Sequence, residues 1–197
     1  MNMIQINNLS KVYNKNSILD NLTINIDNNY IYLIIGSNGS GKSTLLKCIN
    51  NLVSYYGTID IKGSISYMPE SINLPDNLKV NDFLNLLIGI KNKTFNNLNY
   101  LIDAFKLNDH LYKNISKLSF GTKQKILLVI TLLEDSDIYL FDEPLNGLDN
   151  ESIKIYLDEI KKLNQKGKLI IIVTHEEDRI KLDNIKVIKL KTGKIHE

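Results

Sequence analysis

The chain has 197 residues, 43% of them hydrophobic, and its 24 basic and 22 acidic residues leave a net charge of +2. This length suffices for one hydrophobic core, while the near balance of charge, with no lysine cluster interleaved with aromatic residues, disfavours a nucleic-acid-binding protein. The longest nearly unbroken apolar stretch, Ile126 to Leu133, is far shorter than the ~18 residues that cross a bilayer, so we expect no direct membrane insertion.

The first third of the chain is predicted to be rich in β-structure. Met3–Leu9 and Leu22–Ile26 alternate apolar and polar residues like half-buried strands, whereas Tyr30–Ile35 is nearly continuously apolar like a buried strand. The polar run 27–29 predicts a hairpin between the second and third strands. Two short strands are expected further along, at Gly57–Ile61 and Ser64–Met68.

A glycine-rich segment, GSNGSGKST, follows the third predicted strand and precedes the apolar pair Leu45-Leu46. It meets the pattern G-x-x-x-x-G-K-S/T, whose glycines let backbone N–H groups converge at the start of a helix, where the helix dipole favours anions. A triphosphate suits such a loop: Lys42 reaches the β and γ phosphates, Ser43 is placed for Mg²⁺ and Thr44 for a phosphate oxygen. A simple turn is the alternative. The residues expected to contact the nucleotide are Gly36, Ser37, Asn38, Gly39, Ser40, Gly41, Lys42, Ser43 and Thr44.

Helical periodicity begins beyond Pro75 and predicts a small helical lobe from about residue 69 to 117. After Leu118 the pattern alternates between helix and strand, which favours a parallel sheet. A closing hairpin around Gly193 is expected from Lys186–Leu190 and Lys194–Glu197. The predicted helices are Val80–Ile90, Leu98–Phe105, Thr122–Leu133 and Glu151–Leu163, and the predicted strands are Ile138–Phe141 and Leu169–Val173.

Two carboxylates, Asp142 and Glu143, end the apolar strand Ile138–Phe141 at the edge of the sheet where ligands of α/β folds bind. An aspartate here suits Mg²⁺. On an extended backbone Glu143 points the other way, and we expect it to accept a proton from a water attacking the γ phosphate. The alternative is that this pair of carboxylates caps a helix and binds no metal.

Further segments narrow the class of nucleotide-binding protein. Leu118-Ser119-Phe120-Gly121-Thr122 resembles LSGGQ, the signature motif of ATP-binding cassette (ABC) ATPases. Residues 146–149, Asn-Gly-Leu-Asp, resemble that family's D-loop, and His175 resembles its switch histidine. Tyr13 matches the aromatic residue that stacks on adenine. The resemblance runs from residue 3 to residue 190. Individually, helix caps, a turn, a solvated histidine and a packing tyrosine would explain these residues.

The resemblance implies an α/β fold: a P-loop NTPase core with a mixed, largely parallel sheet flanked by helices, an antiparallel β subdomain and a small helical signature-motif lobe. It implies one domain over residues 1–197, with a β-rich part to about 68, a helical lobe to about 121 and the rest of the core to 197. The implied catalytic residues are Glu143, His175 and Lys42, the ATP contacts include Tyr13, Ser119, Gly121 and Asp149, and the Mg²⁺ ligands are Ser43, Asp142 and Glu70.

The family also implies partners. Two cassettes, either two copies of one chain or a chain and a related paralogue, dock head to tail. Each ATP lies between one phosphate loop and the other signature motif, and hydrolysis releases the clamp. A membrane-spanning transporter subunit would be driven by this cycle, and the short helical lobe favours export. Because residues 1–9 carry no secretion signal, we expect a cytoplasmic subunit, peripheral on the inner face of the membrane. The alternatives are a soluble assembly ATPase acting on a protein partner, and a nucleotide sensor without turnover.

The sequence departs from the family pattern at two places. Glu70 stands where the family usually has a glutamine that binds Mg²⁺ and water, so an oxygen ligand is kept while a negative charge is added. Phe120 and Thr122 replace the first glycine and the glutamine of the signature, which predicts weaker contacts with the nucleotide sugar and a closed dimer of low affinity. Outside the motifs, Cys48 is expected to be a small buried hydrophobe, and His110 and His196 to be solvated.

Overall fold

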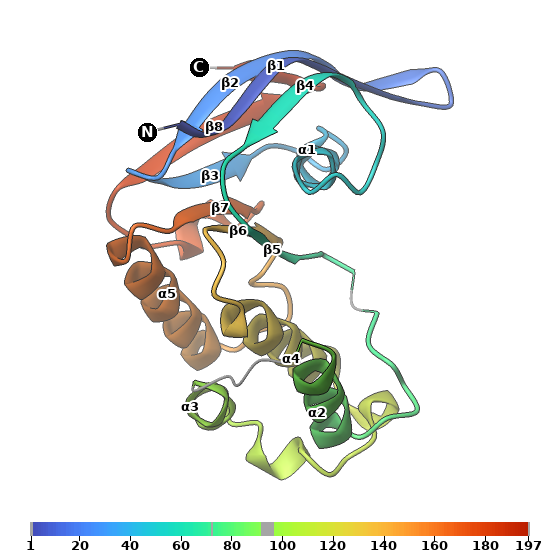
Figure 1. Ribbon diagram of the computed structural model, residues 1–197, viewed down its shortest axis with the longest axis vertical. Coiled ribbons are helices and arrows are strands. Elements are labelled where there is room, and N and C mark those ends of the chain that lie inside the picture. The colour runs from blue at the N-terminus through green and yellow to red at the C-terminus, as the bar shows by residue number, and fades with distance from the viewer. Residues whose placement is uncertain (1, 72, 92–96, 197) are drawn as a thin grey trace. The chain divides into compact units, whose positions relative to one another are not determined.

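The structure is a computed structural model that describes residues 2–71, 73–91 and 97–196 (Figure 1). Its chain divides into two compact units. The first unit holds the residues up to Glu70 together with Ser136–Pro144 and Ile160 onward, and the second holds Ser71–Asp135 and Leu145–Glu159. The division into three segments expected from the sequence stays a prediction.

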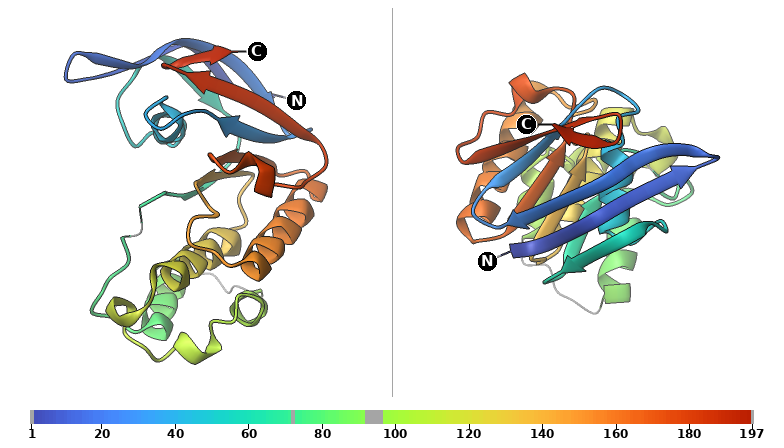
Figure 2. Two further views of the ribbon diagram at one scale, coloured as in Figure 1. Left: turned by 180° about the vertical axis from the view of Figure 1, so that it is seen from behind. Right: turned by 90° about the horizontal axis from the view of Figure 1, so that it is seen from above.

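An antiparallel sheet in the order β2-β1-β4 covers one side of the first unit (Figure 2). Its strands are β1 (Asn2–Tyr13), β2 (Asn16–Asp27) and β4 (Tyr56–Ile61). β1 and β2 are joined by Asn14 and Lys15, both with positive φ, which is the backbone of the tight turns that suit the twist of a hairpin. Apolar side chains on the inner face, among them Ile4 and Ile6, are fully buried.

The second sheet of this unit has the order β5-β6-β7-β3-β8-β9, and all its neighbours are parallel except β8 and β9. Its strands are β3 (Ile31–Ile35), β5 (Ile65–Met68), β6 (Ile138–Asp142), β7 (Leu169–Val173), β8 (Ile185–Lys191) and β9 (Lys194–His196). Every residue of β6 and β7 is buried, as expected for strands covered on both faces. The expected parallel sheet and closing hairpin are confirmed, although Glu197 lies outside the described residues.

The hairpin predicted between the second and third strands is wrong. β2 pairs with β1, while β3 lies between β7 and β8 in the other sheet. The polar residues 27–29 therefore connect two sheets instead of turning within one. β3 is apolar on both faces, and only a central position in a covered sheet buries both of them.

One hydrophobic core joins the two sheets of the first unit and the helix α1 (Lys42–Ile49) that lies between them in Figure 1. Leu45, Leu46 and Cys48 on α1 contribute to it, so the prediction that Cys48 is a small buried hydrophobe is confirmed. The core fixes the helix that begins at Lys42, and this helix in turn places the glycine-rich loop at the carboxyl ends of the parallel strands.

The second unit is helical. It contains α2 (Val80–Lys91), α3 (Leu98–Ala104), α4 (Phe120–Leu133) and the first turns of α5 (Asn150–Gln165), with 3-10 turns at Asn108–His110 and Ile115–Lys117. α4 begins at Phe120, two residues earlier than predicted, because the Ser119 side chain caps it by accepting a hydrogen bond from the Thr122 N–H. A third 3-10 turn, Glu177–Arg179, belongs to the first unit.

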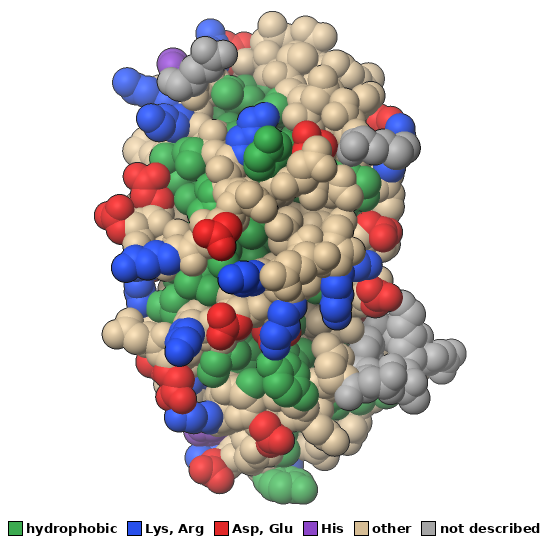
Figure 3. Space-filling model, turned by 90° about the vertical axis from the view of Figure 1, so that its left-hand side faces the viewer, with side chains coloured by type: hydrophobic (Ala, Val, Ile, Leu, Met, Phe, Trp, Pro, Cys, Tyr) green, Lys and Arg blue, Asp and Glu red, His purple; other side chains and the backbone are tan. Residues whose placement is uncertain are grey.

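The surface carries charges of both signs. On the face shown in Figure 3, Lys and Arg side chains lie among Asp and Glu side chains rather than gathering into a basic stripe.

Among the described helices, none combines the length and the apolar character needed to cross a bilayer.

Candidate nucleotide-binding site

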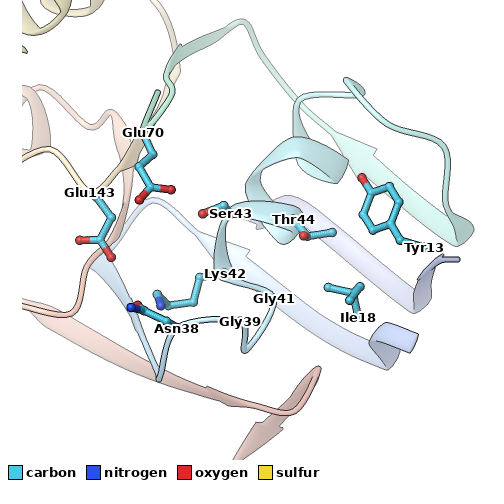
Figure 4. A pocket seen from close by; sticks show the side chains of 10 residues that line it. All are labelled: Tyr13, Ile18, Asn38, Gly39, Gly41, Lys42, Ser43, Thr44, Glu70 and Glu143. Atoms are coloured by element: carbon cyan, nitrogen blue, oxygen red, sulfur yellow. The ribbon is translucent and has the colours of Figure 1, made fainter. Parts of the chain in front are cut away.

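A cavity of about 350 Å³ opens beside the glycine-rich loop, within the size range of small-molecule sites (Figure 4). It is formed wholly by the first unit. Polar groups of the loop and two carboxylates lie at one end, whereas an aromatic and an aliphatic side chain lie at the other. The lining residues are Tyr13, Ile18, Asn38, Gly39, Gly41, Lys42, Ser43, Thr44, Glu70 and Glu143.

Lys42 is the buried cation of this cavity, with 6% of its surface exposed. Its ammonium donates hydrogen bonds to the carbonyl oxygens of Gly36 at 2.9 Å and Ser37 at 3.3 Å. Neither acceptor carries a formal charge, and in the described structure Lys42 makes no hydrogen bond to a carboxylate. An anion that enters the loop would therefore meet a positive charge that is not neutralised.

The first glycine of the loop is required by close packing. A side chain at Gly36 would collide with the carbonyl oxygen of Leu190 in β8 and approach the Ser40 hydroxyl to 2.7 Å. The turn after β8 also touches the loop, because the Gly193 N–H donates to the Ser40 carbonyl at 3.1 Å. The conformation of the phosphate loop thus depends on residues 190–193 as well as on its own glycines.

Asp142 lies under the loop and is 1% exposed. Its Oδ1 accepts a hydrogen bond from the Ser43 hydroxyl at 2.9 Å, whereas its buried Oδ2 has no hydrogen-bond partner among the described residues. Burial raises the pKa of Asp142 to about 6. The hydrogen bond from Ser43 lowers this pKa, whereas the negative charges of Glu70 and Glu143 raise it further. A buried carboxylate oxygen without a partner is a position that a cation would satisfy.

These residues fit Mg²⁺ better than a metal held by protein alone. In the described part of the chain, no three or more His, Cys, Asp or Glu side chains are grouped to hold a metal ion. Mg²⁺ is usually bound through one or two carboxylates together with substrate phosphates and waters. Ser43 and Asp142 supply only two protein ligands beside the anion-binding loop, so phosphates and waters would supply the others.

Glu143 does not have the extended backbone that we expected. It follows β6 with φ of 50°, a left-handed turn, so the alternation argument for its direction is wrong. The turn is held by a hydrogen bond from the Glu143 N–H to the Val173 carbonyl at 2.9 Å, and the side chain lines the cavity while 5% exposed. Figure 4 shows its carboxylate near that of Glu70, so both acidic residues are brought together with Ser43 and Lys42.

His175 is placed beside Glu143 rather than in the loop cavity. Its Nδ1 lies 2.9 Å from the Glu143 Oε2, and its backbone N–H donates to the same oxygen at 3.3 Å. Together with Gly36 and Ser37, His175 lines a neighbouring hollow of about 570 Å³ near Lys189. Contact between His175 and a phosphate stays a prediction.

The remaining predicted residues lie in the second unit. Ser119 uses its hydroxyl as the cap of α4, and it also lies 2.8 Å from the Thr122 hydroxyl. Asp149 accepts hydrogen bonds from Lys125 at 2.8 Å and from the Ser152 N–H at 2.7 Å, and these bonds lower the pKa of Asp149. Ser119 is therefore the N-cap of α4, and its contact with a nucleotide stays a prediction.

Gly147 of the D-loop segment supports the aromatic ring of Phe120. A side chain at Gly147 would place its Cβ 2.5 Å from Phe120 Cδ1, and the residue has φ of 71°. We expect Gly147→Ala to lower the free energy of unfolding by about 2–4 kcal/mol, because the left-handed backbone and the collision with the ring both add cost. Urea denaturation followed by circular dichroism measures this.

The matched control for this prediction is Gly89→Ala in α2. Gly89 has no atom within 4 Å of an added Cβ and lies inside a helix, so alanine there should stabilise by about 0.5–1 kcal/mol. When Phe120→Ala is combined with Gly147→Ala, it should restore the part of the unfolding free energy that the collision removes. Equal stability of Gly147→Ala and the unmodified chain would contradict the packing described.

Two residues near the cavity were missed by the sequence analysis. Ile18 in β2 forms an apolar wall of the cavity together with Tyr13, and Lys11 lies against the Tyr13 ring. A signal for Lys11 was available, since residues two apart on a strand share a face. Ile18 carried no such signal, because its place depends on the pairing of β1 with β2.

Comparison with known proteins identifies the family of the chain. A family model described as ABC transporter matches residues 19–146. An ABC transporter ATP-binding protein of Methanocaldococcus jannaschii is 31% identical, covering 97% of this chain and 75% of the relative, and one of Bacillus subtilis is 33% identical, covering 98% and 94%. Relatives named for import and for export both occur.

A solved dimeric ABC transporter cassette has the same fold, with a TM-score of 0.88 at 24% identity over 99% of this chain and 97% of that one. The expected P-loop NTPase fold, with its mixed sheet, antiparallel sheet and helices, is confirmed. The matched family model covers most of the chain and includes the glycine-rich loop and β6. The chain belongs to the ABC transporter family and is an ATP-binding, ATPase subunit of it.

Proposed function

We propose that the chain binds MgATP in the cavity beside residues 36–44 and hydrolyses it to drive a membrane transporter. One observation carries the proposal: a buried lysine, a hydroxyl bonded to a buried aspartate, and a glutamate line or adjoin one cavity. Such a set offers a cation for phosphates, a metal position and a proton acceptor, which are the recurring parts of phosphoryl-transfer sites.

The position of each residue in or beside the cavity supports a role for it. The loop residues 36–44 and Lys42 would hold the phosphates, and Tyr13 would stack on the base with Ile18 beneath it. Ser43, Asp142 and Glu70 would hold Mg²⁺, which when bound neutralises charge on the phosphate oxygens. Glu143 would take the proton of the attacking water, and His175, whose ring contacts Glu143, would orient that carboxylate and reach the γ phosphate.

The cassette would act as one half of a head-to-tail dimer. Ser119, Gly121 and the amino end of α4 would complete the site of a second cassette, and Asp149 would border it. The start of α4 is suited to an anion because Ser119 and Phe120 are exposed there and the helix dipole is positive at this end. With Phe120 and Thr122 in place of glycine and glutamine, we expect a closed dimer of low affinity.

The partner would be a membrane-spanning subunit that holds this chain on the cytoplasmic face of the membrane. Relatives named as ATP-binding proteins of transporters support this assignment. For the direction of transport we propose export, on the shortness of the helical unit. A soluble assembly ATPase is the second candidate, because the same nucleotide site would serve it.

Affinity purification from the native cell separates these candidates. We expect the tagged chain to sediment with membranes and to carry a multi-spanning protein, and to be released by detergent rather than by salt. Reconstitution of that complex in vesicles with ATP outside then gives the direction: export corresponds to uptake into inside-out vesicles. Recovery only as a soluble complex with a non-membrane protein would favour the assembly ATPase.

A further inference from the structure

Lys11 is a buried lysine without an acidic partner. It is 8% exposed, and its ammonium donates to the Ser54 carbonyl at 2.5 Å and approaches the Ser54 hydroxyl at 3.4 Å. Within the described ranges, no carboxylate forms an ion pair with it. A charge taken out of water needs compensation, and a neutral carbonyl and hydroxyl supply only part of it.

The remaining partner of the ammonium is the aromatic ring of Tyr13. Lys11 Nζ lies 4.4 Å from the ring centroid, within the range of a cation–π interaction. The two side chains meet because residues 11 and 13 of β1 are two apart on one strand. The turn at Asn14 and Lys15 follows immediately, so Tyr13 stands next to the tip of the hairpin formed by β1 and β2.

This contact decides which surface of Tyr13 can meet a ligand. Tyr13 is 41% exposed and lines the cavity with Ile18, and the Lys11 ammonium lies over one face of its ring. The described lining of the cavity does not include Lys11. A planar ligand can therefore stack only on the face that the lysine leaves open.

Lys11 also links β1 to the segment that follows α1. Ser54 lies in the connection that follows α1, and α1 begins at Lys42 in the phosphate loop. One side chain thus ties the strand that carries the aromatic ring to the segment that leaves the phosphate-binding helix. An arrangement fixed before binding costs less entropy when the ligand arrives.

We propose that Lys11 is a positioning residue for the purine base: its ammonium holds the Tyr13 ring from one face so that the opposite face stacks on the base. This inference rests on the proposed nucleotide site, and it assigns to Lys11 a role in recognition of the base and none toward the phosphates.

Titration calorimetry with two ligands tests the role. MgATP contains the base, whereas inorganic tripolyphosphate with Mg²⁺ contains only the phosphates. We expect Lys11→Met to weaken MgATP binding about tenfold, the scale of a partly desolvated cation–π contact, and to leave tripolyphosphate binding within about twofold. Lys11→Arg keeps a cation beside the ring, so it should lose less MgATP affinity than Lys11→Met and keep tripolyphosphate binding.

Two further variants separate positioning from general damage. Lys11→Gln keeps a donor for the Ser54 carbonyl but no charge, and we expect it to lose MgATP affinity like Lys11→Met; it also serves if the methionine variant does not fold. In a Tyr13→Leu background, Lys11→Met should cause no further loss, because the ring through which the lysine acts is gone.

Equal weakening of both ligands, or a full tenfold loss in the Tyr13→Leu background, would overturn the role of Lys11. So would unchanged MgATP binding by both uncharged variants. If the unmodified chain binds neither ligand, the proposed nucleotide site itself fails. The two failures are therefore distinguishable in one experiment.

Discussion

Glu143→Gln is expected to keep MgATP binding and to slow phosphate release by about 10²- to 10⁴-fold, the usual contribution of a positioned proton acceptor. Glutamine has nearly the same shape, and its amide can still contact His175 in the pocket beside β6. It cannot take up the proton of an attacking water at neutral pH. Single-turnover release of labelled phosphate measures the effect, and nucleotide binding is measured on the same preparation.

Asp178→Asn is the control for this variant, since it makes the same carboxylate-to-amide change on an exposed residue near His175 that lies outside the loop cavity. It should retain the turnover of the unmodified chain. Because a cassette that cannot hydrolyse keeps its nucleotide, Glu143→Gln should also dimerise more with MgATP on size exclusion than the unmodified chain does, even though a closed dimer of low affinity is expected. Normal phosphate release by Glu143→Gln would move the proton-acceptor role to another group, and Glu70 is the other carboxylate lining the cavity.

Lys42→Ala is expected to weaken MgATP binding by about 10- to 100-fold, because it removes charge-assisted hydrogen bonds to phosphate from a buried position. In the described structure its ammonium bonds only to the Gly36 and Ser37 carbonyls, so it is available to a ligand at small cost. Equilibrium dialysis with labelled ATP measures the affinity. The same variant should lose tripolyphosphate binding in parallel, unlike the Lys11 variants.

Lys166→Ala provides the comparison for Lys42→Ala. Lys166 is an exposed lysine after α5, in the same unit but away from the cavity, and its replacement should leave affinity unchanged. If Lys42→Ala binds MgATP as tightly as Lys166→Ala does, residues 36–44 are not the phosphate site.

The strands and helices of the parallel core followed from local patterns, because β6 and β7 are apolar on both faces and are bounded by polar turns. The pairing of strands did not follow. Whether residues 27–29 form a hairpin or pass between sheets depends on contacts of β3 with β7 and β8, which lie more than a hundred residues away in sequence. Local periodicity carries no information about such partners.

In the candidate site, too, some residues could be predicted from local sequence and others could not. Lys42, Ser43 and Asp142 were predictable because the glycine-rich pattern and the end of an apolar strand fix their surroundings. The direction of Glu143 was not, since its left-handed φ is set by the hydrogen bond to Val173 on the neighbouring strand. His175 was assigned toward a phosphate by resemblance, yet its partner in the structure is Glu143.

The contacts of residues 190–193 with the phosphate loop bear on how the chain is made. Gly36 packs against the Leu190 carbonyl, and the Gly193 N–H bonds to Ser40. On the ribosome, residues 36–44 emerge early, but the strand that supports them is translated some 150 residues later. A nascent chain therefore cannot hold nucleotide in this geometry until residues 190–193 have been made and have left the ribosome. Shortened products that lack these residues are left with an unsupported loop.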